Sequence, residues 1–352
     1  MRNRIQRFFR IFSFLTFLFT FLVILAGSVV RVTQSGMGCP DWPKCFGYYI
    51  PPTSPEQVKF HPSFEYQKGM MVIENDTLWR ATSNFVSKEN FVREHWEKYP
   101  KHNYAEFYVL QTWIEYVNRL LGAVLGLFVV GMLICSFSYW TTNKKLIGLS
   151  FLMLILTGFQ GWLGALVVAS NLAPIKITIH MVGALMLLGI VVIIQYYLKN
   201  KSDEVINGNF KTIKALSLIT LLLTFAQIMM GTQVREVVDV VAKSMNFEGR
   251  ELWIEQLSVI FPIHRSFSLF VLVINAYLFY RIFKSTADSA LRYAFLLMAI
   301  LLAEIVLGIV LAYFSMPAFA QPLHLLLGSM LFAAQLMLFL AIPKSNTHTG
   351  LY

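Results

Sequence analysis

Eight separate stretches of the chain are long and apolar enough to cross a lipid bilayer as helices. They cover residues 11–30, 107–139, 146–169, 174–198, 212–234, 257–282, 291–314 and 321–342. A helix needs about 20 apolar residues to cross the hydrocarbon core. Only 14% of the 352 residues are charged, whereas roughly 25% of a soluble domain is charged. The sequence therefore predicts an all-α integral membrane protein and excludes a soluble enzyme, a disordered chain and a disulfide-dense secreted scaffold.

The distribution of Lys and Arg predicts which side of the membrane each loop faces. With the N-terminus inside, the inner segments carry fourteen basic residues, and the short outer loops carry only Lys176, Lys243 and Arg250. Basic residues gather in cytoplasmic loops, and long loops contribute little to orientation. We therefore expect a multi-pass protein of the cell (inner) membrane, with both termini cytoplasmic and the long loop, residues 32–106, outside. The net charge of +10 then calls for no nucleic acid partner.

The two halves of the chain, residues 1–200 and 201–352, repeat one pattern of polar and small residues. His180 follows Asn118 by 62 residues, and His324 follows His264 by 60. Because each half has four helices, both halves enter the membrane from the same side and form two four-helix bundles related by a pseudo-twofold axis along the membrane normal. The matching elements are Gly27 to Arg31 with Gly231 to Arg235, Asn118-Arg119 with His264-Arg265, Gln160 to Gly164 with Glu304 to Gly308, and His180 with His324.

Three histidines, His180, His264 and His324, lie in apolar segments, where an imidazole is unfavourable and indicates function. All three fall in the first two turns of even-numbered helices, so they share the outer leaflet. Imidazoles at one depth on neighbouring helices can hold a haem iron. Zinc is disfavoured because no carboxylate or cysteine stands at ligand spacing. Hydrogen bonds between helices are the alternative. The other histidines, predicted to be solvated, are His61, His95, His102 and His348.

Four arginines lie at the predicted outer ends of helices, at the depth of these histidines. A guanidinium group pairs well with the carboxylates of haem propionates. Extension of the side chain to the membrane interface is the alternative. The four are Arg31, Arg119, Arg235 and Arg265.

Two carboxylates lie within or near the apolar segments. Glu115 stands one turn before Asn118 and shares its helix face. Such a group suits proton transfer or stabilisation of a developing cation. The alternative is that Glu115 lies at the membrane interface and faces water. Glu304 stands in the middle of the seventh segment, and its repeat mate Gln160 is uncharged; its role stays open.

Cys39 and Cys45 flank five residues just beyond the first helix, on the predicted outer side. An oxidising compartment favours a disulfide between them, which would close a short ring. A zinc site from this spacing alone is weakly supported. Cys135 lies in the second apolar segment and is expected to pack as an ordinary apolar residue.

Together these features resemble the heme A synthase family over nearly the whole chain. The resemblance rests on the run Gly-Ser-Val-Val-Arg-Val-Thr-Gln-Ser-Gly-Met-Gly-Cys at residues 27–39, the Cys39 and Cys45 pair, Glu115-x-x-Asn118-Arg119, and the histidines of helices 4, 6 and 8. It implies a haem-dependent oxidoreductase that oxidises the C8 methyl group of heme O to a formyl group, giving heme A for terminal cytochrome oxidases.

The resemblance also implies a role for each site residue. Glu115 matches the catalytic glutamate of the family, and the cysteine pair matches a pair to which haem delivery or redox chemistry is ascribed. The C-terminal half would hold a haem b cofactor between His264 and His324, near Arg235 and Arg265. The N-terminal half would hold the substrate heme O near His180, with Asn118, Arg31 and Arg119 around it.

Asn118 departs from the family pattern, which has Glu-x-x-His-Arg at this place. The substrate iron would then have one strong ligand, His180, from these positions. The second cysteine pair that some members carry in the C-terminal half is also missing.

A diheme b-type membrane electron carrier is the first alternative, but it would need two symmetric bis-histidine sites. A multi-pass transporter is the second, and it would need no histidines at one depth. Heme O synthase, membrane lipid and an unidentified electron-transfer protein are the expected partners.

Overall fold

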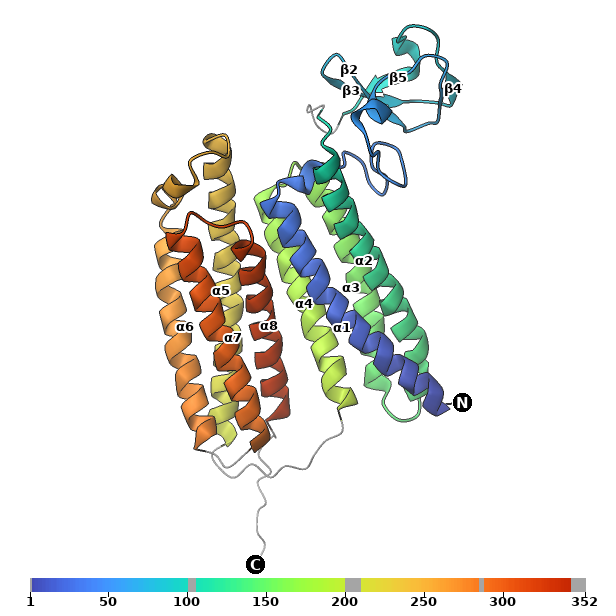
Figure 1. The fold of residues 1–352 in the computed structure, drawn as a ribbon. Coiled ribbons are helices and arrows are strands. Elements are labelled where there is room, and N and C mark those ends of the chain that lie inside the picture. Colours follow the sequence, from blue (N-terminus) through green and yellow to red (C-terminus); the bar gives the residue numbers. More distant parts are fainter. Residues whose placement is uncertain (1, 101–105, 200–209, 285–287, 343–352) are drawn as a thin grey trace, which may run out of the picture. The chain divides into compact units, whose positions relative to one another are not determined.

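The computed structural model describes residues 2–100, 106–199, 210–284 and 288–342 (Figure 1). The chain forms two compact units. The first consists of Met1–Leu25, Leu125–Thr157 and Met181–Tyr352, and the second of Ala26–Val124 and Gly158–His180. Each of the first four helices therefore contributes one end to each unit. The predicted boundary between the halves, at residue 200, lies outside the described residues.

Eight helices of the described chain are long and apolar enough to cross a membrane, as the sequence predicts. They are α1 (Arg2–Val32), α2 (Val109–Ser136), α3 (Lys144–Ala169), α4 (Pro174–Leu198), α5 (Phe210–Ser244), α6 (Ile260–Phe283), α7 (Asp288–Tyr313) and α8 (Ala320–Ala341). The end of α5 corrects the predicted span, which stopped at residue 234. The helix continues because Val238 and Val241 keep an apolar face, which packs against Trp253 and Met316.

Helices α5 to α8 form a four-helix bundle inside the first unit (Figure 1). Each helix contacts the next, and α8 returns to contact α5. The bundle core is aliphatic, with Leu278 on α6, Leu297 on α7 and Leu331 on α8 buried together. A polar contact lies within this bundle, where Nε2 of Gln335 donates to Oδ1 of Asn275 at 3.0 Å. Such interhelical hydrogen bonds join helices where lipid supplies no partner.

The parts of α1 to α4 that belong to the first unit pack in a second aliphatic and aromatic cluster, which also includes Ile228 of α5 and Ala333 of α8. Phe9 of α1, Val129 of α2, Met153 of α3 and Leu188 of α4 are fully buried in it. The opposite ends of these helices belong to the second unit, together with the segment between α1 and α2.

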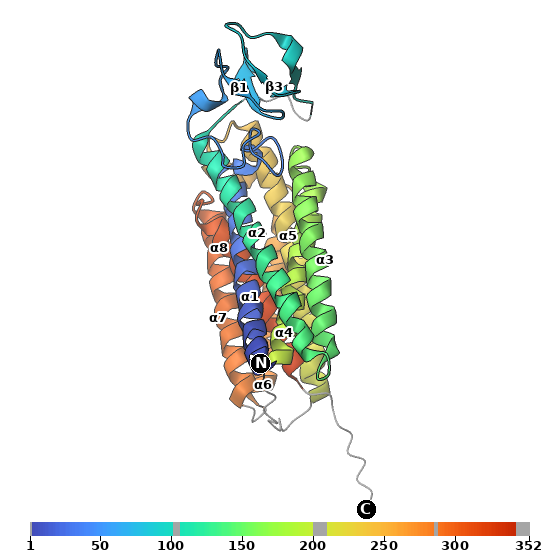
Figure 2. The ribbon, with the colours of Figure 1, turned by 90° about the vertical axis from the view of Figure 1, so that its right-hand side faces the viewer.

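The segment between α1 and α2 contains a small β region, which corrects the prediction of an all-α chain. In one sheet β1 (Glu65–Tyr66) pairs with β4 (Phe85–Val86); in the other the antiparallel order is β2 (Met71–Glu74), β3 (Thr77–Ala81) and β5 (Trp96–Lys98). Figure 2 labels β1 and β3 in this region. Asn75 and Asp76 form the two-residue turn between β2 and β3, with φ of 50° and 52°. Both residue types tolerate the positive φ that such a hairpin turn requires.

Candidate functional site

The carboxylate of Glu115 is fully enclosed near the start of α2, where its side chain has partners at both oxygens. The residue is 3% exposed. Oε2 accepts a hydrogen bond from the backbone N–H of Cys39 at 2.9 Å. Oε1 accepts one from Arg119 at 2.5 Å, one helical turn along the same face. The carboxylate is therefore held in one orientation by a backbone amide and a guanidinium group.

Arg119 also holds the segment that carries Cys39. We call residues 38–45 the cysteine loop. The guanidinium group donates to the backbone oxygens of Asp41 at 2.7 Å, Lys44 at 3.0 Å and Cys39 at 3.2 Å. Charge-assisted bonds of this kind are stronger than neutral ones. Arg119 therefore fixes the loop and the carboxylate of Glu115 at the same time.

The cysteine loop is closed by a disulfide and lies directly against α2. Cys39 and Cys45 are bonded, with an S–S distance of 2.03 Å. The hydroxyl of Thr112 donates to the backbone oxygen of Gly38 at 2.8 Å. A Cβ atom on Gly38 would lie 2.7 Å from the backbone of Gln111, so a side chain there would force the loop away from the helix.

Two titratable groups outside the membrane-spanning segments belong to this loop or touch it. Burial raises the pKa of Asp41, although the Gly47 N–H, 3.0 Å from Oδ2, and the charge of Arg119 act to lower it. Burial also raises the pKa of Tyr99 to about 12, and its hydroxyl donates to the backbone oxygen of Pro40 at 2.7 Å. Both shifts follow from the dry surroundings of the loop.

Each of the three intramembrane histidines, and Asn118, lies against a glycine of the preceding helix. The distance from the Cβ position of the glycine to the facing side chain is 3.6 Å for Gly164 and His180, 3.5 Å for Gly308 and His324, 3.3 Å for Gly231 and His264, and 3.9 Å for Gly27 and Asn118. The glycines let these side chains approach the helix backbone closely. The contacts occur at repeat-equivalent positions of the sequence, two in each half.

His264 and His324 face each other in the C-terminal bundle. Their ring centroids are 6.5 Å apart, and the ring planes are 79° from parallel. The Nδ1 atoms of both rings are buried and make no hydrogen bond within the described chain. Nδ1 of His324 lies 3.3 Å from Oε1 of Glu304, which is ion-pair distance without hydrogen-bond alignment. The backbone oxygen of His264 accepts a hydrogen bond from Gln227 at 3.0 Å.

The corresponding polar groups of the N-terminal half are His180, Asn118 and Gln160. Nδ1 of His180, Oδ1 of Asn118 and both amide atoms of Gln160 are buried without a hydrogen-bond partner in the part of the chain that is described. Buried polar groups in proteins nearly always have a partner. These unpaired atoms therefore mark a place that suits a polar ligand.

The four arginines of the prediction have different partners. Arg119 is engaged with Glu115 and the cysteine loop, as described above. Arg235 pairs with Asp239 at 2.7 Å and donates to Oε1 of Gln321. Arg265 is exposed, with its guanidinium group 5.8 Å from the ring centre of Phe261. Arg31 is half-buried in the last turn of α1. Contacts with haem propionates stay a prediction for all four.

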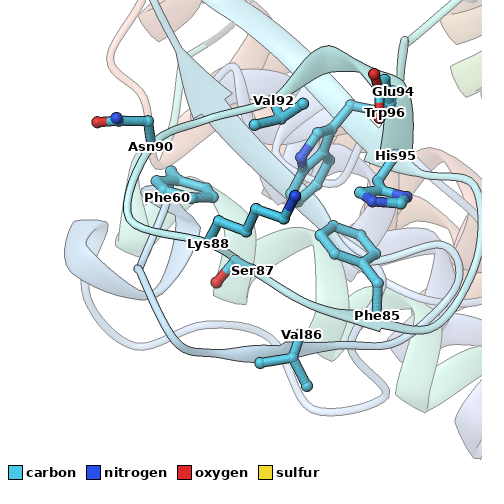
Figure 3. A pocket seen from close by; sticks show the side chains of 10 residues that line it. All are labelled: Phe60, Phe85, Val86, Ser87, Lys88, Asn90, Val92, Glu94, His95 and Trp96. Carbon is cyan, nitrogen blue, oxygen red and sulfur yellow. The ribbon is translucent and has the colours of Figure 1, made fainter.

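Two of the remaining histidines, His61 and His95, have partners in the segment between α1 and α2. The ring of His95 stacks on Phe85 with centroids 4.5 Å apart, and Nε2 of His61 contacts the backbone oxygen of Glu56 at 2.8 Å. His102 and His348 lie outside the described residues. A pocket in the β region, shown in Figure 3, is lined by Phe60, Phe85, Val86, Ser87, Lys88, Asn90, Val92, Glu94, His95 and Trp96. None of these was predicted as a site residue.

Sequence reasoning missed the contacts that join the cysteine loop to α2. Gly38 and Thr112 were not singled out, although Gly38 directly precedes Cys39 and Thr112 stands one turn before Glu115. Asp41, whose backbone oxygen binds Arg119, was also missed. Within the described residues, no three His, Cys, Asp or Glu side chains come together as a metal site. Of the three intramembrane histidines, His264 and His324 face each other in the C-terminal half, and His180 lies in the N-terminal half.

The chain matches the COX15-CtaA family model, described as cytochrome oxidase assembly protein, over residues 10–78 and 77–336. A heme A synthase of Rickettsia prowazekii is 23% identical over 334 residues, which cover 88% of this chain and 91% of that protein. A heme A synthase of Ehrlichia ruminantium is 24% identical over 356 residues, covering 90% of this chain and 88% of that protein. A heme A synthase of Shewanella oneidensis is 26% identical over 219 residues, which cover 62% of this chain and about half, 54%, of that protein.

Proposed function

The chain belongs to the COX15-CtaA family of cytochrome oxidase assembly proteins, and from this membership we propose that it is a heme A synthase. As such it is a multi-pass membrane oxidoreductase that converts heme O to heme A by oxidising the C8 methyl group to a formyl group. The relatives that carry this name cover most of the chain at low identity. The roles of individual residues are our proposal and are argued below.

One observation supports this function over its alternatives, namely that the repeated glycine contacts hold different residues in the two halves. The C-terminal half brings His264 and His324 together, whereas the N-terminal half has His180 and Asn118 in the equivalent places. A diheme electron carrier would use two bis-histidine irons. One cofactor site and one site with a single strong ligand suit an enzyme that works on a haem.

The residues of the C-terminal half fit a haem b. A metal–imidazole bond is about 2 Å long, so two imidazoles that would hold one iron between them would have ring centroids roughly 6 Å apart. The 6.5 Å between His264 and His324 agrees with this arrangement. We propose Nε2 as the ligand atom of His324, because its Nδ1 lies 3.3 Å from Oε1 of Glu304. Such a haem, when bound, would exchange electrons one at a time.

In the N-terminal half, His180 would bind the iron of heme O. Asn118 stands where the family pattern has a histidine, and its carboxamide would not be a strong iron ligand. The carboxamide can hydrogen-bond to a small ligand or leave the sixth position open. The unpaired amide of Gln160 is a further polar group of this half. We propose that this half is the substrate site.

Glu115 would act on the reacting methyl carbon. Because its carboxylate is buried and fixed by two donors, it needs no reorganisation when charge develops beside it. It can accept a proton from the substrate or stabilise a cationic carbon. The cysteine loop and Arg119 position the carboxylate and keep water from it. Arg31, Arg235 and Arg265 are the candidates for binding haem propionates.

We further propose that the N- and C-termini are cytoplasmic and that the β region lies outside. The support is the excess of Lys and Arg in the segments that would be inside. The haem sites would then lie in the outer leaflet of the cell membrane, and the disulfide in an oxidising space. Heme O synthase would be a suitable source of substrate, and an electron acceptor must complete the oxidation.

Pigment extraction tests the function. The full chain is expressed in cells that make heme O and no heme A, and the haems are extracted from membranes and identified by mass. A heme A synthase yields heme A. An electron carrier would yield only haem b with unchanged heme O, and a transporter would yield no haem that depends on its expression.

A further inference from the structure

Glu304 is a carboxylate in the middle of α7 that the proposed reaction does not use. Its side chain is 17% exposed, and Oε1 lies 3.3 Å from Nδ1 of His324. Oε2 is buried and makes no hydrogen bond to any described residue. An acidic group at this depth of a membrane helix is unfavourable and usually has a function.

Gly328 makes the space in which this carboxylate lies. It stands one turn after His324 on α8 and is buried. A Cβ atom at this position would lie 3.1 Å from Oε1 of Glu304, closer than side chains normally approach. Helix α8 therefore presents an imidazole and a small vacancy on one face, and α7 places the carboxylate against both.

The repeat provides a comparison. Gln160 takes the place of Glu304 in the N-terminal half, and its amide makes no hydrogen bond among the described residues. Nδ1 of His264 has no acidic group at ion-pair distance in the same described part of the chain. His324 alone of the three intramembrane histidines has such a partner there. The carboxylate thus distinguishes the proposed cofactor site from the substrate site, and one axial histidine from the other.

We propose that Glu304 is a positioning residue for His324. When haem b is bound, a small rotation from the 3.3 Å contact would let its carboxylate accept a hydrogen bond from Nδ1–H, which would leave Nε2 for the iron and fix the plane of the ring. Metal-binding histidines commonly donate their second N–H to a carboxylate, which raises the basicity of the ligand. The added negative charge stabilises the ferric over the ferrous iron and lowers the reduction potential. This inference rests on the proposed haem b site between His264 and His324.

The test uses the purified full-length protein with its haem b and two readouts that do not depend on activity. Potentiometric titration gives the midpoint potential, and electron paramagnetic resonance of the ferric haem reports the angle between the axial ring planes. Glu304→Gln removes the charge and keeps the shape, as in Gln160. Glu304→Ala removes the contact. Glu255→Gln, at an exposed carboxylate between α5 and α6, is the matched control.

We expect Glu304→Gln to raise the midpoint potential, with the ferric/ferrous equilibrium changing on the order of tenfold, about 59 mV for one electron. Its resonance spectrum should stay close to that of the wild type. Glu304→Ala should change both the potential and the spectrum, and Glu255→Gln neither. Gly328→Ala, which crowds the carboxylate without removing it, should shift the potential in the same direction by a smaller amount.

If Glu304→Gln and Gly328→Ala both keep the wild-type potential and spectrum, the inference is wrong. Loss of haem from Glu304→Gln but not from Glu255→Gln would support it, because the amide removes charge and not volume. If the wild type itself carries no low-spin haem b, the proposed cofactor site fails. That result differs from failure of the role of Glu304, which would leave a normal haem in every variant.

Discussion

The backbone N–H of Cys39 donates a hydrogen bond to Oε2 of Glu115 at 2.9 Å, across 76 residues of sequence. The proposed catalytic carboxylate on α2 is therefore oriented by the loop that follows α1. Arg119 binds the other carboxylate oxygen and three backbone oxygens of the same loop. A substitution in the cysteine loop should therefore change the rate of heme A formation without altering the histidines proposed to bind the haem irons.

Replacing the disulfide should slow heme A formation. In the variant with Cys39→Ser and Cys45→Ser the loop is no longer closed, so the N–H of Cys39 is less well fixed toward Glu115. A charge-assisted hydrogen bond contributes roughly 1.5–3 kcal/mol, which corresponds to a rate about tenfold lower or more. The measurement is the yield of heme A per bound haem b. An unchanged yield would mean that the disulfide does not position the carboxylate.

Thiol labelling checks the bond itself. A maleimide reagent applied to the native protein without reductant should modify Cys135 at most, since Cys39 and Cys45 are bonded. Reduction should expose two further thiols. Rapid labelling of both loop cysteines before reduction would contradict the disulfide.

The stability of the cysteine loop should depend on pH through Asp41. Burial raises the pKa of this carboxyl group above its ordinary value of 3.8, so the folded loop binds the proton more tightly than the unfolded chain does. Its contribution to stability is therefore complete at a pH below that ordinary value and is lost as the pH rises through the higher pKa of the folded state. Asp41→Asn keeps an oxygen to accept the Gly47 N–H and removes the charge.

Hydrogen exchange of the Gly47 amide, corrected for its intrinsic rate, is the measurement. We expect protection to fall with rising pH in the wild type and to vary much less in Asp41→Asn. Equal slopes in the two proteins would show that Asp41 does not control the loop.

The spans could be predicted from sequence because the bilayer imposes a length and a composition on every helix. The repeat predicts that His180 is equivalent to His324 and Asn118 to His264, and each of these four side chains lies against a glycine of the preceding helix. The β region was missed, although Asn75-Asp76 suits a hairpin turn and the flanking segments contain Val72, Ile73 and Trp79, residue types that strands favour. Segment length and hydropathy identify membrane helices only, so no structure was predicted for the long loop.

The contacts of Glu115 and Glu304 could not be predicted in the same way. The sequence placed Glu115 on the face of Asn118, but the contact with Cys39 depends on how a distant loop folds back on α2. Glu304 was left without a role because its partner His324 lies on another helix, and only the packing of α7 on α8 brings the two together. Pairings between elements require the tertiary structure.

His264→Ala and His324→Ala should each remove the low-spin haem b signal from the reduced-minus-oxidised spectrum. Loss of one strong axial ligand leaves a five-coordinate or weakly held iron. His180→Ala is the control, since it belongs to the other half and should keep the signal. A spectrum that survives both replacements in the C-terminal half would refute the assignment of the cofactor ligands.

The iron in the N-terminal site should accept an added ligand. With His180 as the one strong ligand, cyanide or imidazole can bind at the free position, whereas Asn118→His would occupy it. Asn118 lies against Gly27 as His264 lies against Gly231. We expect a ligand-binding difference spectrum in the wild type that is strongly reduced in Asn118→His. Two axial histidines on this iron in the wild type, one of them His61 or His95 from the β region, would contradict the prediction.

The role of Glu115 in the conversion of heme O to heme A is tested most directly by the ratio of the two haems extracted from cells that make heme O. The comparison includes the wild type, Glu115→Gln and Glu115→Ala, with Glu106→Gln as the control at an exposed carboxylate just before α2. We expect heme A from the wild type and the control. Both Glu115 variants should give heme O alone, with haem b still bound, because the alanine removes the carboxylate and the amide keeps its shape without its charge. Heme A from Glu115→Ala or Glu115→Gln at the level of the control would contradict the role of Glu115, and absence of heme A from the wild type would contradict the function itself.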